Sequence, residues 1–110
     1  MKTDDRIREG RVCDPRTVAE QIGVMTILAI SGGRVMVIRD ADGESIGIAF
    51  PCGDQRTVEV TLDFSDTYTV RRYREIVRGA RRGDIVTEFH ADDIYCDQVA
   101  DVAYTASCWK

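Results

Sequence analysis

Histidine is very scarce in this sequence, because His90 is the only one. Any histidine-based catalytic group therefore has to be assembled around this single side chain. Proline is almost as rare, with two residues, whereas hydrophobic residues make up 44% and charged residues 31% of the 110 positions. That balance excludes a disordered or fibrous protein and is typical of one folded domain.

Long apolar runs are also missing. The longest covers residues 23–30, fewer than half of the about 20 residues that a membrane-spanning helix needs. Residues 1–16 alternate acidic and basic side chains without an apolar centre, a pattern that excludes a secretory signal. We therefore expect no membrane association and a location in the cytoplasm of the host cell that makes the protein.

The spacing of the four cysteines contains no CxxC motif and no Cys/His pair of the kind that holds zinc. In a reducing cytoplasm these cysteines are expected to be free thiols. No phosphate-binding loop of the GxxxxGK[ST] type is present either. The sequence therefore predicts neither a metal site nor a bound cofactor.

The first 13 residues are polar and aperiodic, and predict a flexible N-terminal segment before a single domain over residues 14–110. Asp14 and Pro15 together predict a helix start, and Gly32–Gly33 a helix end. Four apolar residues recur at helical spacing between them, which predicts one buried face. They are Val18, Ile22, Met25 and Ala29. An alternative for residues 24–30 alone is a buried strand.

The middle of the chain has the pattern of a series of strands joined by short turns. The expected strands cover 34–39, 46–50, 57–63, 68–74 and 84–89. The clearest alternation is in 57–63, where Val58 and Val60 point one way and Glu59 the other. This pattern predicts a sheet with one face exposed to water.

After the strands, Asp92 is the expected N-cap of a tail helix, with Asp93 in its first turn. The apolar stripe of this helix is expected at Tyr95, Val99, Val102 or Ala103, and Ala106, with Trp109 packing the helix onto the sheet. The resulting fold class is α+β: about five antiparallel strands in a meander, flanked by an N-terminal and a C-terminal helix.

Charge is distributed very unevenly along the second half of the chain. Residues 71–82 contain six arginines and one acid, a net charge of +5, and residues 84–101 contain six acids and no lysine or arginine. The candidate basic hairpin consists of Arg71, Arg72, Tyr73, Arg74, Arg78, Arg81 and Arg82. The candidate acidic surface of the tail helix consists of Asp92, Asp93, Asp97 and Asp101.

Three interpretations of this charge remain open. The two surfaces can neutralise each other within the chain or across a homodimer, or they can bind an external protein. The hairpin can also bind nucleic acid, because guanidinium groups pair with phosphates and an aromatic ring stacks on bases. A separate interpretation, which does not depend on this charge, is a small enzyme in which His90 works with Asp92, Asp93 or Cys96.

Three segments of the chain resemble a family of small uncharacterised proteins encoded by bacteriophages and prophages. Residues 26–34 (TILAISGGR) resemble the family pattern VAxTIxxQLGG, residues 58–70 resemble VKITL followed by DTYxV, and residues 95–99 (YCDQV) resemble YCDQL. The resemblance spans residues 17–109, although 103–107 lack the glycine of the family. It implies a helix at 26–34 and an origin in an actinobacteriophage or another mobile element. It also implies an accessory role, and we expect binding of a host or phage macromolecule, without catalysis.

Overall fold

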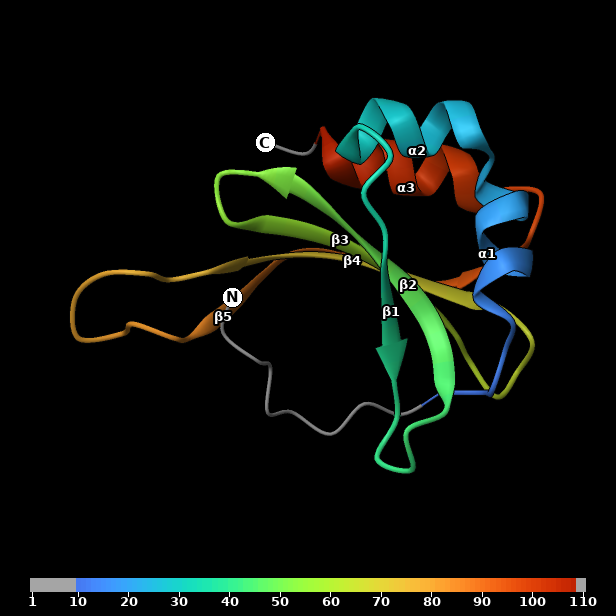
Figure 1. Ribbon diagram of the computed structural model, residues 1–110, viewed down its shortest axis with the longest axis horizontal. Coiled ribbons are helices and arrows are strands. Elements are labelled where there is room, and N and C mark those ends of the chain that lie inside the picture. Colours follow the sequence, from blue (N-terminus) through green and yellow to red (C-terminus); the bar gives the residue numbers. More distant parts are fainter. Residues whose placement is uncertain (1–9, 109–110) are drawn as a thin grey trace.

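Five strands form one antiparallel sheet in chain order, and three helices lie across one of its faces (Figure 1). The computed structural model describes residues 10–108. The helices are α1 (Pro15–Ile22), α2 (Val24–Ser31) and α3 (Val99–Ser107). The strands are β1 (Met36–Arg39), β2 (Ser45–Gly53), β3 (Arg56–Leu62), β4 (Tyr68–Glu75) and β5 (Ile85–Ile94). The predicted α+β meander is confirmed, and residues 24–31 are helical.

The N-terminal helical region begins and ends where the sequence predicts. The Asp14 side chain accepts a hydrogen bond from the backbone N–H of Arg16 at 2.9 Å, and Pro15 occupies the first turn. At the other end, Gly32 closes α2 in the left-handed conformation with φ 66°. Within residues 10–108, no helix is long and apolar enough to cross a membrane.

The prediction of one continuous N-terminal helix is wrong, because the chain breaks at Gly23. This glycine has φ 93°, a value that ends α1 and starts α2 in a new direction. The apolar positions therefore do not share one face: Val18 and Ile22 are buried, whereas Met25 and Ala29 are exposed. The side of α2 that enters the core carries Ile27 and Ile30 instead.

The prediction that the tail helix starts at Asp92 is also wrong. Strand β5 continues to Ile94, with Ala91 paired to Val70 and Ile94 paired to Tyr68. Pairing with β4 on both sides of Asp92 and Asp93 keeps this segment extended, so no helix begins here for Asp92 to cap. Helix α3 starts at Val99, and its buried residues Val99, Ala103 and Ala106 agree with the predicted stripe. The inclusion of Tyr95 in that stripe is wrong, because Tyr95 precedes the helix and is 61% exposed.

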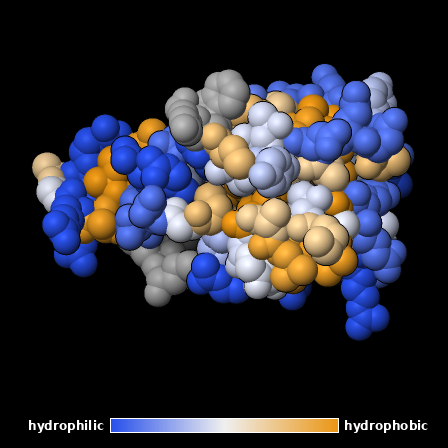
Figure 2. Space-filling model, turned by 90° about the horizontal axis from the view of Figure 1, so that it is seen from above, coloured by the Kyte–Doolittle hydropathy of each residue, from blue (hydrophilic) through white to orange (hydrophobic). Residues whose placement is uncertain are grey.

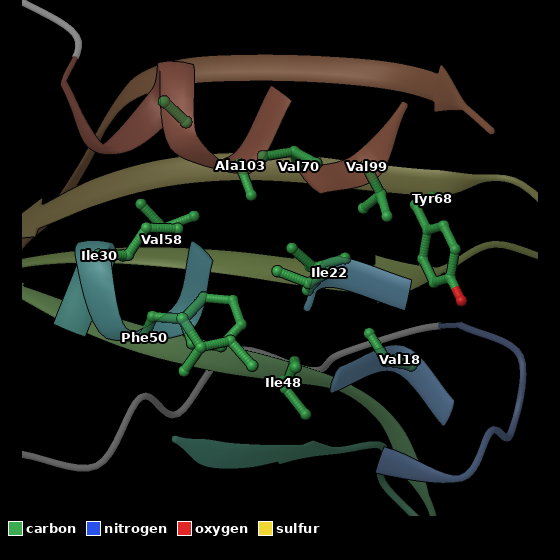
Figure 3. Close-up of a cluster of buried hydrophobic side chains, with 13 residues drawn as sticks. Val18, Ile22, Ile30, Ile48, Phe50, Val58, Tyr68, Val70, Val99 and Ala103 are labelled. Carbon is green, nitrogen blue, oxygen red and sulfur yellow. The ribbon is translucent and has the colours of Figure 1, made fainter. Parts of the chain in front are cut away.

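The hydrophobic core lies between the helices and the inner face of the sheet (Figure 3). Side chains from β2, β3 and β4 meet those of the three helices there. The largest fully buried residues of this cluster are Phe50, Ile48, Val18, Val58, Val60, Val70 and Val99. Short apolar residues of α3, such as Ala103 and Ala106, let this helix lie close to the strands.

The opposite face of the sheet carries no helix in the described structure, and we call it the open face (Figure 1). Glu59 lies on this face, in register with Ala49 of β2 and Arg71 of β4. The expectation that Glu59 faces water is wrong, because it is 3% exposed. The Glu59 carboxylate lies beside the guanidinium group of Arg71, because pairing of β3 with β4 places the two side chains next to each other.

The β4–β5 hairpin extends beyond the helices at one end of the molecule (Figure 1), whose longest extent is 40 Å. The backbone N–H groups of Arg11 and Cys13 donate to Leu62 and Ser45, so this part of the predicted flexible segment is attached to the sheet. The rest of that prediction, for residues 1–9, lies outside the described residues, as does the predicted packing of Trp109.

Candidate functional site

The predicted basic hairpin is the β4–β5 hairpin, and the structure divides its six arginines into two groups. Three lie on β4 and three in the loop that follows: Arg71, Arg72 and Arg74, then Arg78, Arg81 and Arg82. The strand group is buried or half-buried, whereas the loop group is exposed. We call the exposed three the hairpin tip.

Arg71 of the strand group and Tyr73, also on β4, are engaged on the open face. The Nε of Arg71 donates to Glu59 Oε1 at 3.0 Å, and its Nη2 contacts the same oxygen. The guanidinium carbon of Arg71 also lies 4.9 Å from the centre of the Tyr73 ring, a cation–π contact. The predicted aromatic partner for a base therefore stacks on an arginine of its own strand.

Arg72 lies on the other face of β4, at the end of the core, and is 5% exposed. Its Nε is 3.2 Å from Glu88 Oε1, the oxygen that also accepts a hydrogen bond from Arg56 Nε at 2.9 Å. A bulge in β5 between the partners of Arg72 and Tyr73 is what places Glu88 there.

Arg71 and Arg72 are thus paired inside the chain, but with acids that the sequence analysis did not select. Glu59 and Glu88 take this role. Among residues 10–108, neither Asp97 nor Asp101 takes part in an ion pair. These partners could be found only from strand register, because Glu59 is 12 residues from Arg71 along the chain.

The hairpin tip keeps its charge exposed at the end of the molecule (Figure 2, left). Arg81 Nε is 3.1 Å from Asp84 Oδ2, with side chains 69% and 53% exposed. Within the described part of the chain, Arg78 and Arg82 form no ion pair. Exposed ion pairs such as Arg81–Asp84 contribute little to stability and open readily. All three guanidinium groups of the tip are therefore available to a binding partner.

The four acids of the predicted tail-helix surface do not lie on one helix. Asp92 and Asp93 belong to β5, Asp97 lies in the following turn, and Asp101 lies in α3. All four are exposed. The acidic surface is therefore a rim at one edge of the sheet and the start of α3.

His90 and Asp92 are within hydrogen-bond distance of each other on β5. His90 Nε2 is 2.9 Å from Asp92 Oδ1, and Thr69 Oγ1 donates to the same oxygen at 3.0 Å. These two hydrogen bonds, from His90 first and Thr69 second, hold the pKa of Asp92 below its usual range. The side chains of His90 and Asp92 are 50% and 59% exposed. Water therefore competes with a substrate for hydrogen bonds to both side chains.

The surface that the sequence analysis missed is the outer side of α2. Val24, Met25 and Leu28 are 69%, 75% and 49% exposed, and Tyr104 of the adjacent α3 is 48% exposed. Figure 2 shows the resulting apolar area on the helical side of the molecule. Helix α2 is apolar on nearly every side (VMTILAIS), and this pattern is the signal that could have identified an outer apolar face.

A shallow hollow of about 400 Å³ lies between α2 and α3, beside these exposed residues. Its small residues are Ala29 and Ala100, and its larger rim residues include Met25, Tyr104 and Asp101. The hollow exists because the alanine side chains are small, and the larger side chains form its border. The hollow suits an apolar side chain with a hydrogen-bond donor near the Asp101 carboxylate.

The four cysteines are free thiols in the structure. In the part of the chain that the structure describes, no three His, Cys, Asp or Glu side chains come together as a metal-binding group. No family model matches this chain, and comparison with curated proteins and with solved structures found no match either. The resemblance to phage-encoded proteins stays a prediction.

Proposed function

We propose that this protein is a non-catalytic binding module that engages another protein through the outer face of α2 and the adjoining hollow. The observation that carries the proposal is the exposure of three neighbouring apolar side chains on one helix, with Met25 at 75%. Contiguous apolar patches on a monomer mark interaction sites more often than isolated apolar residues do.

The chemistry of this face indicates what the partner presents. Methionine adapts its shape to an apolar surface, and both methionine and tyrosine are enriched at interface centres. The alanine-lined hollow accepts one apolar side chain, and Asp101 at its rim favours a donor beside it. We therefore infer a partner with an amphipathic helix or loop that inserts an apolar anchor and carries a basic or amide group next to it.

The sequence resemblance supports an accessory role for this module in a phage or another mobile element. Its place of action would be the cytoplasm of the host. The scarcity of histidine supports binding in preference to catalysis, because His90 is the only histidine in the sequence and its side chain is half exposed.

The experiment that tests the proposal is a comparison of Met25→Glu with Phe64→Glu. Tagged variants are used to capture partners from the lysate of the host cell, and the captured partner is then titrated. We expect Met25→Glu to weaken binding at least about tenfold, because a buried carboxylate replaces an apolar anchor.

Phe64→Glu is the matched control, since Phe64 is 76% exposed in the β3–β4 turn, away from the hollow. It should leave the affinity unchanged, and both variants should keep the thermal stability of the parent. Equal binding by the two variants would refute the α2 surface as the docking face. Light scattering on the purified protein shows whether the partner is instead a second copy.

Nucleic-acid binding by the hairpin tip is the second candidate, favoured by three exposed arginines at the end of a protruding hairpin. We expect Arg81→Ala/Arg82→Ala to weaken binding to all DNA sequences alike. The slope of log K against log salt should fall by about 0.7 to 0.9 for each phosphate that the variant no longer neutralises. Fluorescence anisotropy with a labelled oligonucleotide at several salt concentrations measures both quantities.

Arg16→Ala/Arg39→Ala is the control for this second candidate, because both residues are exposed arginines outside the hairpin. It removes the same charge and should leave the slope nearly unchanged. No binding by the parent at about 50 μM protein in low salt would exclude the tip as a nucleic-acid contact.

A further inference from the structure

Three arginines gather on the helix-side face of the sheet, at the point where the β4–β5 hairpin leaves the core. Arg56 of β3 and Arg74 of β4 are direct register partners, so their side chains lie on the same face. Arg72 lies two residues along β4 and also points to this face, opposite Val58. We call these residues the arginine triad; they are distinct from the hairpin tip.

The three positive charges of the triad exceed the negative charge of the acidic side chains beside it. Glu88 Oε1 serves both Arg56 and Arg72, at 2.9 and 3.2 Å. Asp54 is 3.8 Å from Arg56 but is 90% exposed, so water screens its charge. Among the described residues, none forms an ion pair with Arg74.

Two buried donors of the triad have no hydrogen-bond acceptor. The Nε atoms of Arg72 and Arg74 are inaccessible to solvent and lack a hydrogen-bond partner. For Arg72, the Glu88 oxygen lies at ion-pair distance but outside hydrogen-bonding geometry. A buried N–H of a charged group that lacks an acceptor is destabilising, and such groups in native structures call for an explanation.

The nearby thiol does not supply the missing negative charge. Burial raises the pKa of Cys52, although Arg72 and Arg56 act in the opposite direction, and Glu88 raises it further. Cys52 is therefore a neutral neighbour at physiological pH. The site holds three guanidinium groups and the carboxylate of Glu88; the other carboxylate that forms an ion pair with the triad among the described residues, Asp54, is exposed.

We infer that the arginine triad is a binding site for a phosphate group. Phosphate carries one to two negative charges near neutral pH, which matches the surplus charge beside Glu88. Its oxygens can accept hydrogen bonds from several guanidinium donors at once. Arg56 and Arg74 keep partial exposure, so the anion approaches from their side and reaches Arg72 beneath. This inference is independent of the α2 surface proposed above.

The test is titration of the ¹⁵N-labelled protein with inorganic phosphate, with sodium chloride of equal ionic strength as the reference. We expect the Nε–H signals of Arg72 and Arg74 to shift and saturate. The midpoint of thermal unfolding should rise by about 5 °C at a phosphate concentration tenfold above Kd. Failure of these two signals to move beyond the chloride reference would overturn the inference.

Arg74→Gln and Arg16→Gln form the matched pair, since each removes one positive charge and Arg16 lies on α1, outside the triad. Arg74→Gln should weaken phosphate binding at least about tenfold. In phosphate-free buffer it should leave the unfolding midpoint equal or higher, because an unpaired charge has been removed. A merely structural arginine would instead lower the midpoint. Equal losses of affinity in the two variants would also overturn the inference.

A second titration with a twelve-residue oligothymidylate distinguishes the sources of the phosphate. Shifts of the same Nε–H signals by both probes assign the triad to a nucleic-acid backbone. Shifts by inorganic phosphate alone assign it to a free phosphate or a phosphorylated small molecule. Either pattern supports the site, and absence of shifts with both probes contradicts it.

Discussion

Gly47→Ala is expected to lower the free energy of unfolding by about 3 to 4 kcal/mol, or to prevent folding. A Cβ atom at Gly47 would lie 2.8 Å from Thr61 Cα and 3.0 Å from the carbonyl carbon of Val60, with the Val60 oxygen closer still. All three atoms belong to the backbone of β3, so no side-chain rotation relieves the overlap. Strands β2 and β3 would have to separate at the centre of the sheet. Urea unfolding followed by circular dichroism measures the loss.

Gly79→Ala is the control for this prediction. Gly79 lies in the hairpin loop with φ 83°, and its added Cβ would meet no atom within 4 Å. Only the left-handed backbone conformation opposes this substitution, at a cost of about 1 to 2 kcal/mol. Equal losses at the two positions would show that the strands do not approach each other closely at Gly47.

Arg71→Gln and Glu59→Gln are each expected to destabilise the protein by about 3 kcal/mol. Glu59 is 3% exposed and the Arg71 side chain is 16% exposed, so each substitution removes a partner from a charge in a low-dielectric environment. The double variant should be less destabilised than the sum of the single variants. The coupling free energy from this cycle should be about 2 kcal/mol.

The exposed Arg81–Asp84 pair provides the comparison for that cycle. Its side chains are 69% and 53% exposed, and the coupling free energy from Arg81→Gln and Asp84→Asn should be below about 1 kcal/mol. Added salt should reduce this small coupling further and affect the Glu59–Arg71 coupling much less. A Glu59–Arg71 coupling as small as that of the exposed pair would contradict the buried ion pair.

Local features of the fold were predictable because they depend on residues close together in the chain. The Asp14 side chain caps α1 by accepting a hydrogen bond from Arg16, only two residues along the chain. Gly32 ends α2 because glycine adopts the left-handed conformation easily. The alternation of Val58 and Val60 with polar residues likewise indicated a strand whose valines enter the core.

The errors arose where another residue overrode a local signal. Asp92 has the side chain of a helix cap, but pairing of β5 with β4 provides backbone partners, and the carboxylate binds His90 and Thr69 instead. Met25 continues the helical spacing of Ile22, but Gly23 changes the helix direction and leaves Met25 outside. Neither competing effect is visible from spacing alone.

The candidate sites, too, were predictable from the sequence in part only. The charge surplus of residues 71–82 was evident from the sequence, whereas the division between buried strand arginines and an exposed tip required the strand register. The arginine triad contains Arg56, which lies outside the basic segment. It joins the triad only because β3 is antiparallel to β4.

The sequence by itself determined the α+β class, the order of the strands along the chain and the uneven charge, since these follow from periodicity, turn residues and composition. The tertiary structure alone decided which charges are neutralised, which apolar side chains of α2 remain outside and where Gly47 must lack a side chain. Those outcomes depend on distances between residues far apart in the chain, which register and packing determine.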